Sequence, residues 1–79
     1  MNAEVNVKRT AQMLANLRTM NDMSQAQVAA EVGVSQSAVA AYEAGRRVPR
    51  DEVKVAYSRL FGVPVGKIFY GEVHKCSSK

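Results

Sequence analysis

The stretch SQAQVAAEVGVSQSAVAAYEAG, residues 24–45, decides the fold of this 79-residue chain. Ser24 and Ser35 stand where helices would begin, and a serine hydroxyl caps a helix by accepting from an unpaired amide of its first turn. Gly33 and Gly45 stand where those helices would end, because glycine takes the left-handed conformation of a helix terminus without strain. The pattern predicts two short helices and a three-residue turn between them: residues 25–32, 36–44 and 33–35.

Small and apolar residues within this stretch meet the steric needs of a helix-turn-helix, in which two short helices cross at a tight turn. Ala29 lets the helices approach closely, and Gly33 permits a positive φ in the turn. Val34 fills the corner, and Val39 anchors the second helix in the core. We therefore interpret residues 24–44 as a helix-turn-helix.

Helical signals continue on both sides of this motif. Toward the N-terminus, apolar residues recur at three- and four-residue spacing until Asn21-Asp22, which tolerate the conformation that ends a helix. After the motif, Asp51 and Glu52 favour a helix start through the helix dipole, and Pro64 favours another. These signals predict three more helices: residues 7–20, 51–61 and 64–70.

Every predicted element is helical, so the predicted fold class is all-α. We expect one compact domain of four to five helices over residues 7–71, with flexible termini at 1–6 and 72–79. The alternative for the C-terminal part is a β-strand across KIFYGEV, residues 67–73, which is one way to build a dimer interface.

The ionisable residues argue against catalysis. His74 is the only histidine and Cys76 the only cysteine, and both lie in the polar tail. A zinc site or a histidine-based triad needs more partners than this tail offers, so we expect no enzyme activity, no metal and no cofactor. The apolar runs are short and the N-terminus lacks the apolar core of a signal peptide. We therefore expect no membrane segment and a cytoplasmic protein.

The distribution of charge is uneven in a way that indicates a nucleic-acid partner. The chain has a formal net charge of +4 and a pI near 9.6, yet the charged residues of stretch 31–45 are two glutamates. Arg46 and Arg47 follow directly after it. Basic residues attract phosphates of any sequence, whereas discrimination between sequences comes from groove contacts. A helix without basic residues, followed directly by arginines, is therefore typical of a surface that reads bases and holds phosphates at its edge.

Residues 17–49, LRTMNDMSQAQVAAEVGVSQSAVAAYEAGRRVP, and residues 61–71, FGVPVGKIFYG, resemble the Cro/phage-repressor (Xre-type) helix-turn-helix family. The resemblance implies a lambda-repressor-like DNA-binding domain. It also implies a sequence-specific transcriptional regulator of double-stranded DNA, a repressor in our interpretation, that reads the major groove with helix 36–44. The runner-up interpretation is an antitoxin-type interaction module, which binds a partner protein as well as DNA.

The resemblance assigns roles to individual residues. Gln36 opens the reading helix, and a glutamine can bond an adenine edge at two points. Alanine methyls can pack against thymine methyls. The residues expected to contact bases are Gln36, Ser37, Ala40 and Ala41. The residues expected to contact phosphates are Gln25, Ser35, Tyr42, Arg46, Arg47 and Arg50, with Lys54 a weaker candidate.

Arg18 and Glu43 match a family pair that links the first and third helices. We expect them to form a structural ion pair, with phosphate contact a secondary role of Arg18.

The expected partners are an operator DNA and a second copy of the chain. A homodimer would bind a pseudo-palindromic operator, and no small-molecule effector is expected of so short a regulator. The apolar C-terminal stretch is the expected dimer interface, through Val63, Val65, Ile68, Phe69 and Tyr70.

Overall fold

The computed structural model describes residues 7–71 and contains five helices there. The termini predicted to be flexible, together with His74 and Cys76, lie outside these residues. The helices are α1 (Val7–Met20), α2 (Gln25–Val32), α3 (Gln36–Glu43), α4 (Asp51–Phe61) and α5 (Val65–Phe69). The all-α prediction is confirmed. The strand alternative is wrong for the part of 67–73 that is described, because residues 67–69 belong to α5 and residues 70–71 form no strand.

The caps expected from the sequence define the central motif. The Ser24 hydroxyl accepts from the Gln27 amide at 3.0 Å, and the Gln27 side chain accepts from the Ser24 amide at 2.7 Å. This reciprocal capping box satisfies two amides that a helix start otherwise leaves unpaired. Ser35 caps α3 through its hydroxyl alone, which accepts from the Ala38 amide at 3.1 Å. Gly33 ends α2 with φ of 79°, as the turn requires.

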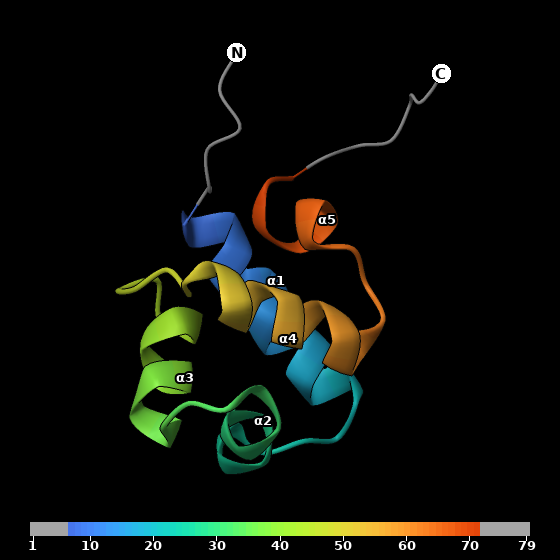
Figure 1. The fold of residues 1–79 in the computed structure, drawn as a ribbon. Helices are drawn as coiled ribbons and strands as arrows, with labels where there is room; N and C mark the ends of the chain where they lie inside the picture. Colours follow the sequence, from blue (N-terminus) through green and yellow to red (C-terminus); the bar gives the residue numbers. More distant parts are fainter. Residues whose placement is uncertain (1–6, 72–79) are drawn as a thin grey trace.

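All five helices contribute to one core. The largest fully buried side chains are Leu14, Val28, Val39, Tyr57, Ile68 and Phe69. In Figure 1, α2 and α3 lie at one end of the molecule and α5 at the other, with α1 and α4 between them. Burying a leucine, isoleucine or phenylalanine side chain stabilises a fold by about 1.5–3 kcal/mol each. The core therefore holds α3 rigidly on one end of the bundle.

Two residues of the expected dimer interface belong to this core, so that part of the prediction is wrong. Ile68 and Phe69 have no exposed surface and pack within their own chain. The cause is that α5 folds back onto α1 and α4. A side chain already buried within one chain has no surface left for a partner. Val63, Val65 and Tyr70 remain partly exposed.

Polar side chains of α1 and α4 fasten α5 in this position. The buried Thr10 hydroxyl donates to the Phe69 carbonyl at 3.4 Å, and Arg9 donates to the Lys67 carbonyl at 3.3 Å. Lys54 of α4 donates to the Tyr70 hydroxyl at 2.8 Å, and its side chain is only 9% exposed. Lys54 is therefore a structural link between α4 and α5, and its prediction as a phosphate contact is wrong.

Candidate nucleic-acid interface

The outer face of α3 carries three of the four predicted base-reading residues. Gln36 and Ser37 are exposed, and Ala40, one turn further on, is half-buried. Ala41 is 7% exposed and faces the core, so its prediction as a base contact is wrong. Consecutive side chains of a helix point about 100° apart, which is why Ala40 lies on the outer face and the adjacent Ala41 is buried.

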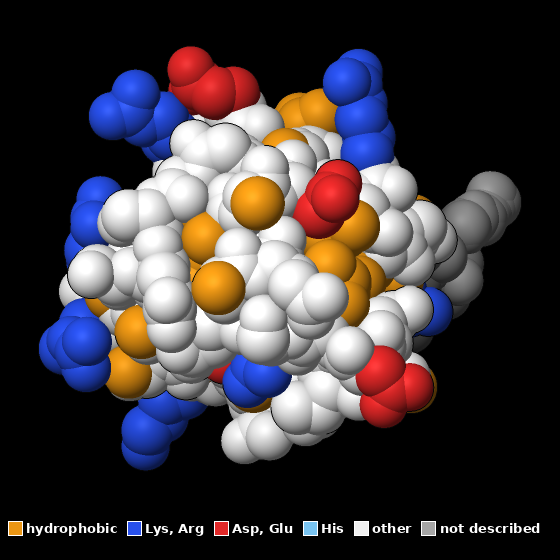
Figure 2. Space-filling view, turned by 90° about the horizontal axis from the view of Figure 1, so that it is seen from below, with side chains coloured by type: hydrophobic (Ala, Val, Ile, Leu, Met, Phe, Trp, Pro, Cys, Tyr) orange, Lys and Arg blue, Asp and Glu red, His pale blue; other side chains and the backbone are white. Residues whose placement is uncertain are grey.

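The end of the molecule that α2 and α3 form combines an uncharged centre with a basic rim. Figure 2 shows this end: its middle is mostly white and orange, and Lys and Arg side chains gather along one edge. Small uncharged side chains can enter a groove, whereas guanidinium groups at the edge can reach phosphates. The distribution agrees with the one predicted from the sequence.

A polar network fixes the orientation of α3. Arg18 of α1 donates to both carboxylate oxygens of Glu43, from Nε at 2.8 Å and from Nη2 at 3.0 Å. Its remaining nitrogen, Nη1, donates to the Met23 carbonyl at 3.0 Å. Gln25 of α2 donates to Glu43 at 3.2 Å. Side chains of α1 and α2 thus both bind one carboxylate of α3.

The predicted ion pair between Arg18 and Glu43 is confirmed. The hydrogen bond to Glu43 raises the pKa of Arg18 and so favours the charged guanidinium. All three of its nitrogens already donate to protein acceptors, and we therefore assign Arg18 to bracing rather than to phosphate contact. Gln25 braces Glu43 as well, whereas phosphate contact by Gln25 stays a prediction.

The segment between α3 and α4 carries the three arginines predicted to hold phosphates. Arg46, Arg47 and Arg50 are all exposed. The Arg47 guanidinium carbon lies 5.7 Å from the centre of the Tyr42 ring, a cation–π contact that limits where this long side chain can go. Tyr42 itself is 4% exposed and packs edge-on against Tyr57.

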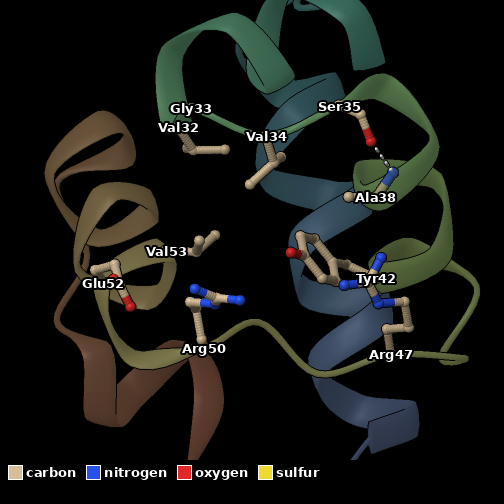
Figure 3. Close-up of a pocket in the computed structure, with 10 residues that line it drawn as sticks. All are labelled: Val32, Gly33, Val34, Ser35, Ala38, Tyr42, Arg47, Arg50, Glu52 and Val53. Atoms are coloured by element: carbon tan, nitrogen blue, oxygen red, sulfur yellow. Dashed lines mark hydrogen bonds between the residues drawn. The ribbon is translucent and has the colours of Figure 1, made fainter.

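A groove of about 440 Å³ lies between α3 and α4, next to this segment. Figure 3 shows its two walls, with Tyr42 on the α3 side and Val53 on the α4 side. Arg50 points into the space between them, and Arg47 lies against the Tyr42 ring. The full lining is Val32, Gly33, Val34, Ser35, Ala38, Tyr42, Arg47, Arg50, Glu52 and Val53.

A family model described as "Helix-turn-helix" matches residues 14–68, more than half of the chain. The chain belongs to the Xre-type helix-turn-helix family. It is a DNA-binding transcriptional regulator of that type. The match spans α2, α3 and the arginine segment, which are the parts that form the surface described above. No curated protein matches the chain in sequence.

Solved structures share the fold of this Xre-type domain. The restriction-modification controller protein C.AhdI from Aeromonas hydrophila superposes with a TM-score of 0.74 at 23% identity, over 81% of this chain and 97% of that one. The clp gene regulator ClgR from Corynebacterium glutamicum gives 0.73 at 16% identity, over 85% and 71% of the two chains.

An enzyme contains the same fold. Hydroxypropylphosphonic acid epoxidase from S. wedmorenis gives a TM-score of 0.70 at 20% identity, and the match covers 86% of this chain but 36% of the epoxidase. At such identities these likenesses describe the fold alone.

Within residues 7–71, no cluster of His, Cys, Asp and Glu is positioned to hold a metal ion. None of the helices described here has the length and hydropathy that crossing a bilayer requires.

Three residues with structural roles in this Xre-type domain were not identified from the sequence. Thr10, Arg9 and Lys54 all act on α5, more than a dozen residues away along the chain. Local patterns predict helices and caps, whereas a hydrogen bond between distant elements depends on the final packing. The one available signal was Thr10, a polar residue on the apolar side of the first helix.

Proposed function

We propose that this chain is a repressor that binds a pseudo-palindromic DNA operator as a homodimer. One observation carries the proposal: an uncharged, exposed face of α3 is braced by Arg18, Glu43 and Gln25 and flanked by exposed arginines. Such a face can enter the major groove while the arginines hold the phosphate backbone. The protein would act by binding in the cytoplasm rather than by catalysis.

In the proposed complex, Gln36 is the main base reader, with Ser37 and Ala40 beside it. Ser35, Tyr42, Arg46, Arg47 and Arg50 would contact phosphates, with Gln25 at the start of α2. In a dimer the two α3 helices would lie about one helical turn of DNA apart, roughly 34 Å. The partly exposed Val63, Val65 and Tyr70 support an interface near α5.

Selection of bound sites from random DNA tests the whole proposal. We expect a sequence with two inverted half-sites, from which an operator duplex can be made. Recovery of unrelated sequences without a shared motif would contradict sequence-specific binding. A single half-site with no inverted copy would contradict the dimer.

Gln36→Ala tests the assignment of the reading helix. We expect it to weaken operator binding by about 1–3 kcal/mol and to relax preference at one base position. Fluorescence anisotropy with operator duplexes changed one base pair at a time measures both effects. Gln12→Ala is the matched control, since Gln12 is an exposed glutamine of α1 whose side chain bonds Asn16. Unchanged discrimination in Gln36→Ala would show that another element reads the bases.

Sedimentation equilibrium tests the dimer. The double variant Val63→Ser, Val65→Ser should shift the population toward monomer, because less apolar area would be buried between chains. A wild-type chain that stays monomeric at high concentration, with and without operator DNA, would contradict the proposed homodimer.

A further inference from the structure

The groove between α3 and α4 contains a polar group that the fold leaves unused. Tyr42 is only 4% exposed, and its hydroxyl, which reaches solvent at the groove wall, makes no hydrogen bond with any residue from 7 to 71. Figure 3 shows the hydroxyl pointing into the groove rather than into the core. The ring is held in place by the core while the hydroxyl faces the groove, so this hydroxyl is a fixed hydrogen-bonding group available to a ligand there.

A second unpaired donor points into the same space. Arg50 points into the groove and makes no ion pair or hydrogen bond within the described chain. Arg50 is also the N-cap of α4, and its side chain does not cap the helix. The amides of Val53 and Lys54 bond the Arg50 carbonyl, and Asp51 and Glu52 already place carboxylates at this helix start, so the attraction of the groove for an anion comes from its arginines.

The charge and shape of the lining define the ligand further. Two arginines and one glutamate line the groove, which gives a net charge of +1 at neutral pH. Val34 and Val53 provide an apolar wall on the side of the turn. A volume of about 440 Å³ lies within the range of small-molecule sites, roughly 300–1,000 Å³.

We infer that this groove binds a small free organic oxyanion, a phosphate or carboxylate head carried on a compact apolar body. The head accepts hydrogen bonds from the Tyr42 hydroxyl and the Arg50 guanidinium, and the body packs against Val34 and Val53. This departs from the expectation that so short a chain has no effector. Binding at the groove is independent of DNA, whereas its consequence rests on the proposed function. Tyr42 and Arg50 are also proposed phosphate contacts, so the anion and the operator exclude one another.

Nuclear magnetic resonance on the full ¹⁵N-labelled chain without DNA tests the site itself. The probes are phenyl phosphate, inorganic phosphate and phenol, titrated at constant ionic strength maintained with sodium chloride. We expect saturable shifts confined to amides of residues 33–35 and 50–53. Phenyl phosphate should bind more tightly than inorganic phosphate, and phenol should bind most weakly.

Two variants and a matched control assign the contacts. Tyr42→Phe removes one hydroxyl, and Arg50→Met removes one charge while keeping a long side chain. Each should raise the Kd for phenyl phosphate about tenfold, the loss expected for a hydrogen bond to a charged group. Arg59→Met, at an exposed arginine of the same helix outside the groove, should leave that Kd unchanged. The amide spectrum of each variant reports whether it is folded.

The regulatory consequence is measured with the selected operator. Phenyl phosphate at ten times its own Kd should raise the Kd for DNA about tenfold if the two ligands exclude one another. Unsaturable shifts spread over the surface would overturn the site, as would a Kd that Tyr42→Phe and Arg50→Met leave unchanged. Shifts in the groove that appear only with duplex DNA would also overturn it, while leaving the proposed operator binding intact.

Discussion

Tyr57 carries a buried polar group that the core leaves without a hydrogen bond. Its ring packs against Tyr42, Phe61 and Phe69 with centroids 6.1–6.3 Å apart, and no part of the residue is exposed. Its hydroxyl is buried and has no hydrogen-bond partner in the described chain. Leaving such a group unpaired costs about 1–3 kcal/mol, a cost that the burial and aromatic contacts of the ring offset.

Tyr57→Phe should therefore stabilise the domain by about 1 kcal/mol, because it removes the unpaired hydroxyl and keeps the ring. Urea denaturation measures the change in the free energy of unfolding. Tyr70→Phe is the matched control: it deletes the hydroxyl that accepts from Lys54 at 2.8 Å and should destabilise the domain. If Tyr57→Phe destabilised the domain as well, the Tyr57 hydroxyl must have a partner in solution.

The same burial makes stability depend on alkaline pH. Removal from water disfavours the phenolate, so burial raises the pKa of Tyr57 above its ordinary value near 10. Its contribution is intact below the unfolded pKa and is lost as pH rises above about 10, since only the unfolded chain then releases the proton easily. Between about pH 9 and 11, wild type should lose more stability than Tyr57→Phe. Parallel pH slopes for the two proteins would contradict this.

Glu43 is the residue on which the orientation of α3, the proposed reading helix, depends. Glu43→Ala removes three hydrogen bonds and leaves the Arg18 guanidinium, whose side chain is 19% exposed, without its main partner. We expect a loss of about 2 kcal/mol, less than for a fully buried pair because water reaches part of Arg18. Glu31→Ala, at an exposed glutamate of α2, should change stability by less than about 0.5 kcal/mol. An unchanged melting temperature in Glu43→Ala would contradict the bracing role.

At the scale of elements, short-range chemistry made the helices predictable. The ends of α2 depend on Ser24, Gln27 and Gly33, all within or next to the helix. The sequence did not determine whether a short apolar helix packs against its own chain or against a partner. Ile68 and Phe69 suit either a partner's surface or their own core, and only contacts from α1 and α4 decide between them. The sequence likewise left open which of Ala40 and Ala41 faces the core, because that depends on how α3 packs against its neighbours.

The contribution of the α2 capping box to the stability of the domain can be tested directly. Ser24→Ala should destabilise the domain by about 1 kcal/mol, since the Gln27 amide loses its acceptor. Gln27→Ala should destabilise it less, because the Ser24 amide that it frees is at an exposed site and can bond water. The double variant should lose less than the sum, because the two bonds support one another. Strict additivity in thermal unfolding would mean that the two bonds act independently.

At the scale of the whole molecule, α5 and the reading surface occupy opposite ends (Figure 1). In the proposed complex, this separation leaves the region near α5 available to a second copy while α3 faces DNA. The net charge of +4 is therefore less informative than its placement, since the segment after α3 supplies three exposed arginines beside an uncharged face. In the proposed complex, affinity comes from that segment and discrimination from α3.

Arg47→Ala separates the affinity that the arginine segment supplies from the discrimination that α3 supplies. It also reports how many copies of the chain bind one DNA duplex. Each lost phosphate contact reduces the slope of log K against log salt by about 0.9, so the slope should fall by about one for a bound monomer and about two for a dimer. Affinity should fall alike for operator and unrelated duplexes. Lys67→Ala, at an exposed lysine of α5, should leave the slope unchanged. A weaker affinity with an unaltered slope would mean that Arg47 acts by packing on Tyr42 instead of neutralising a phosphate.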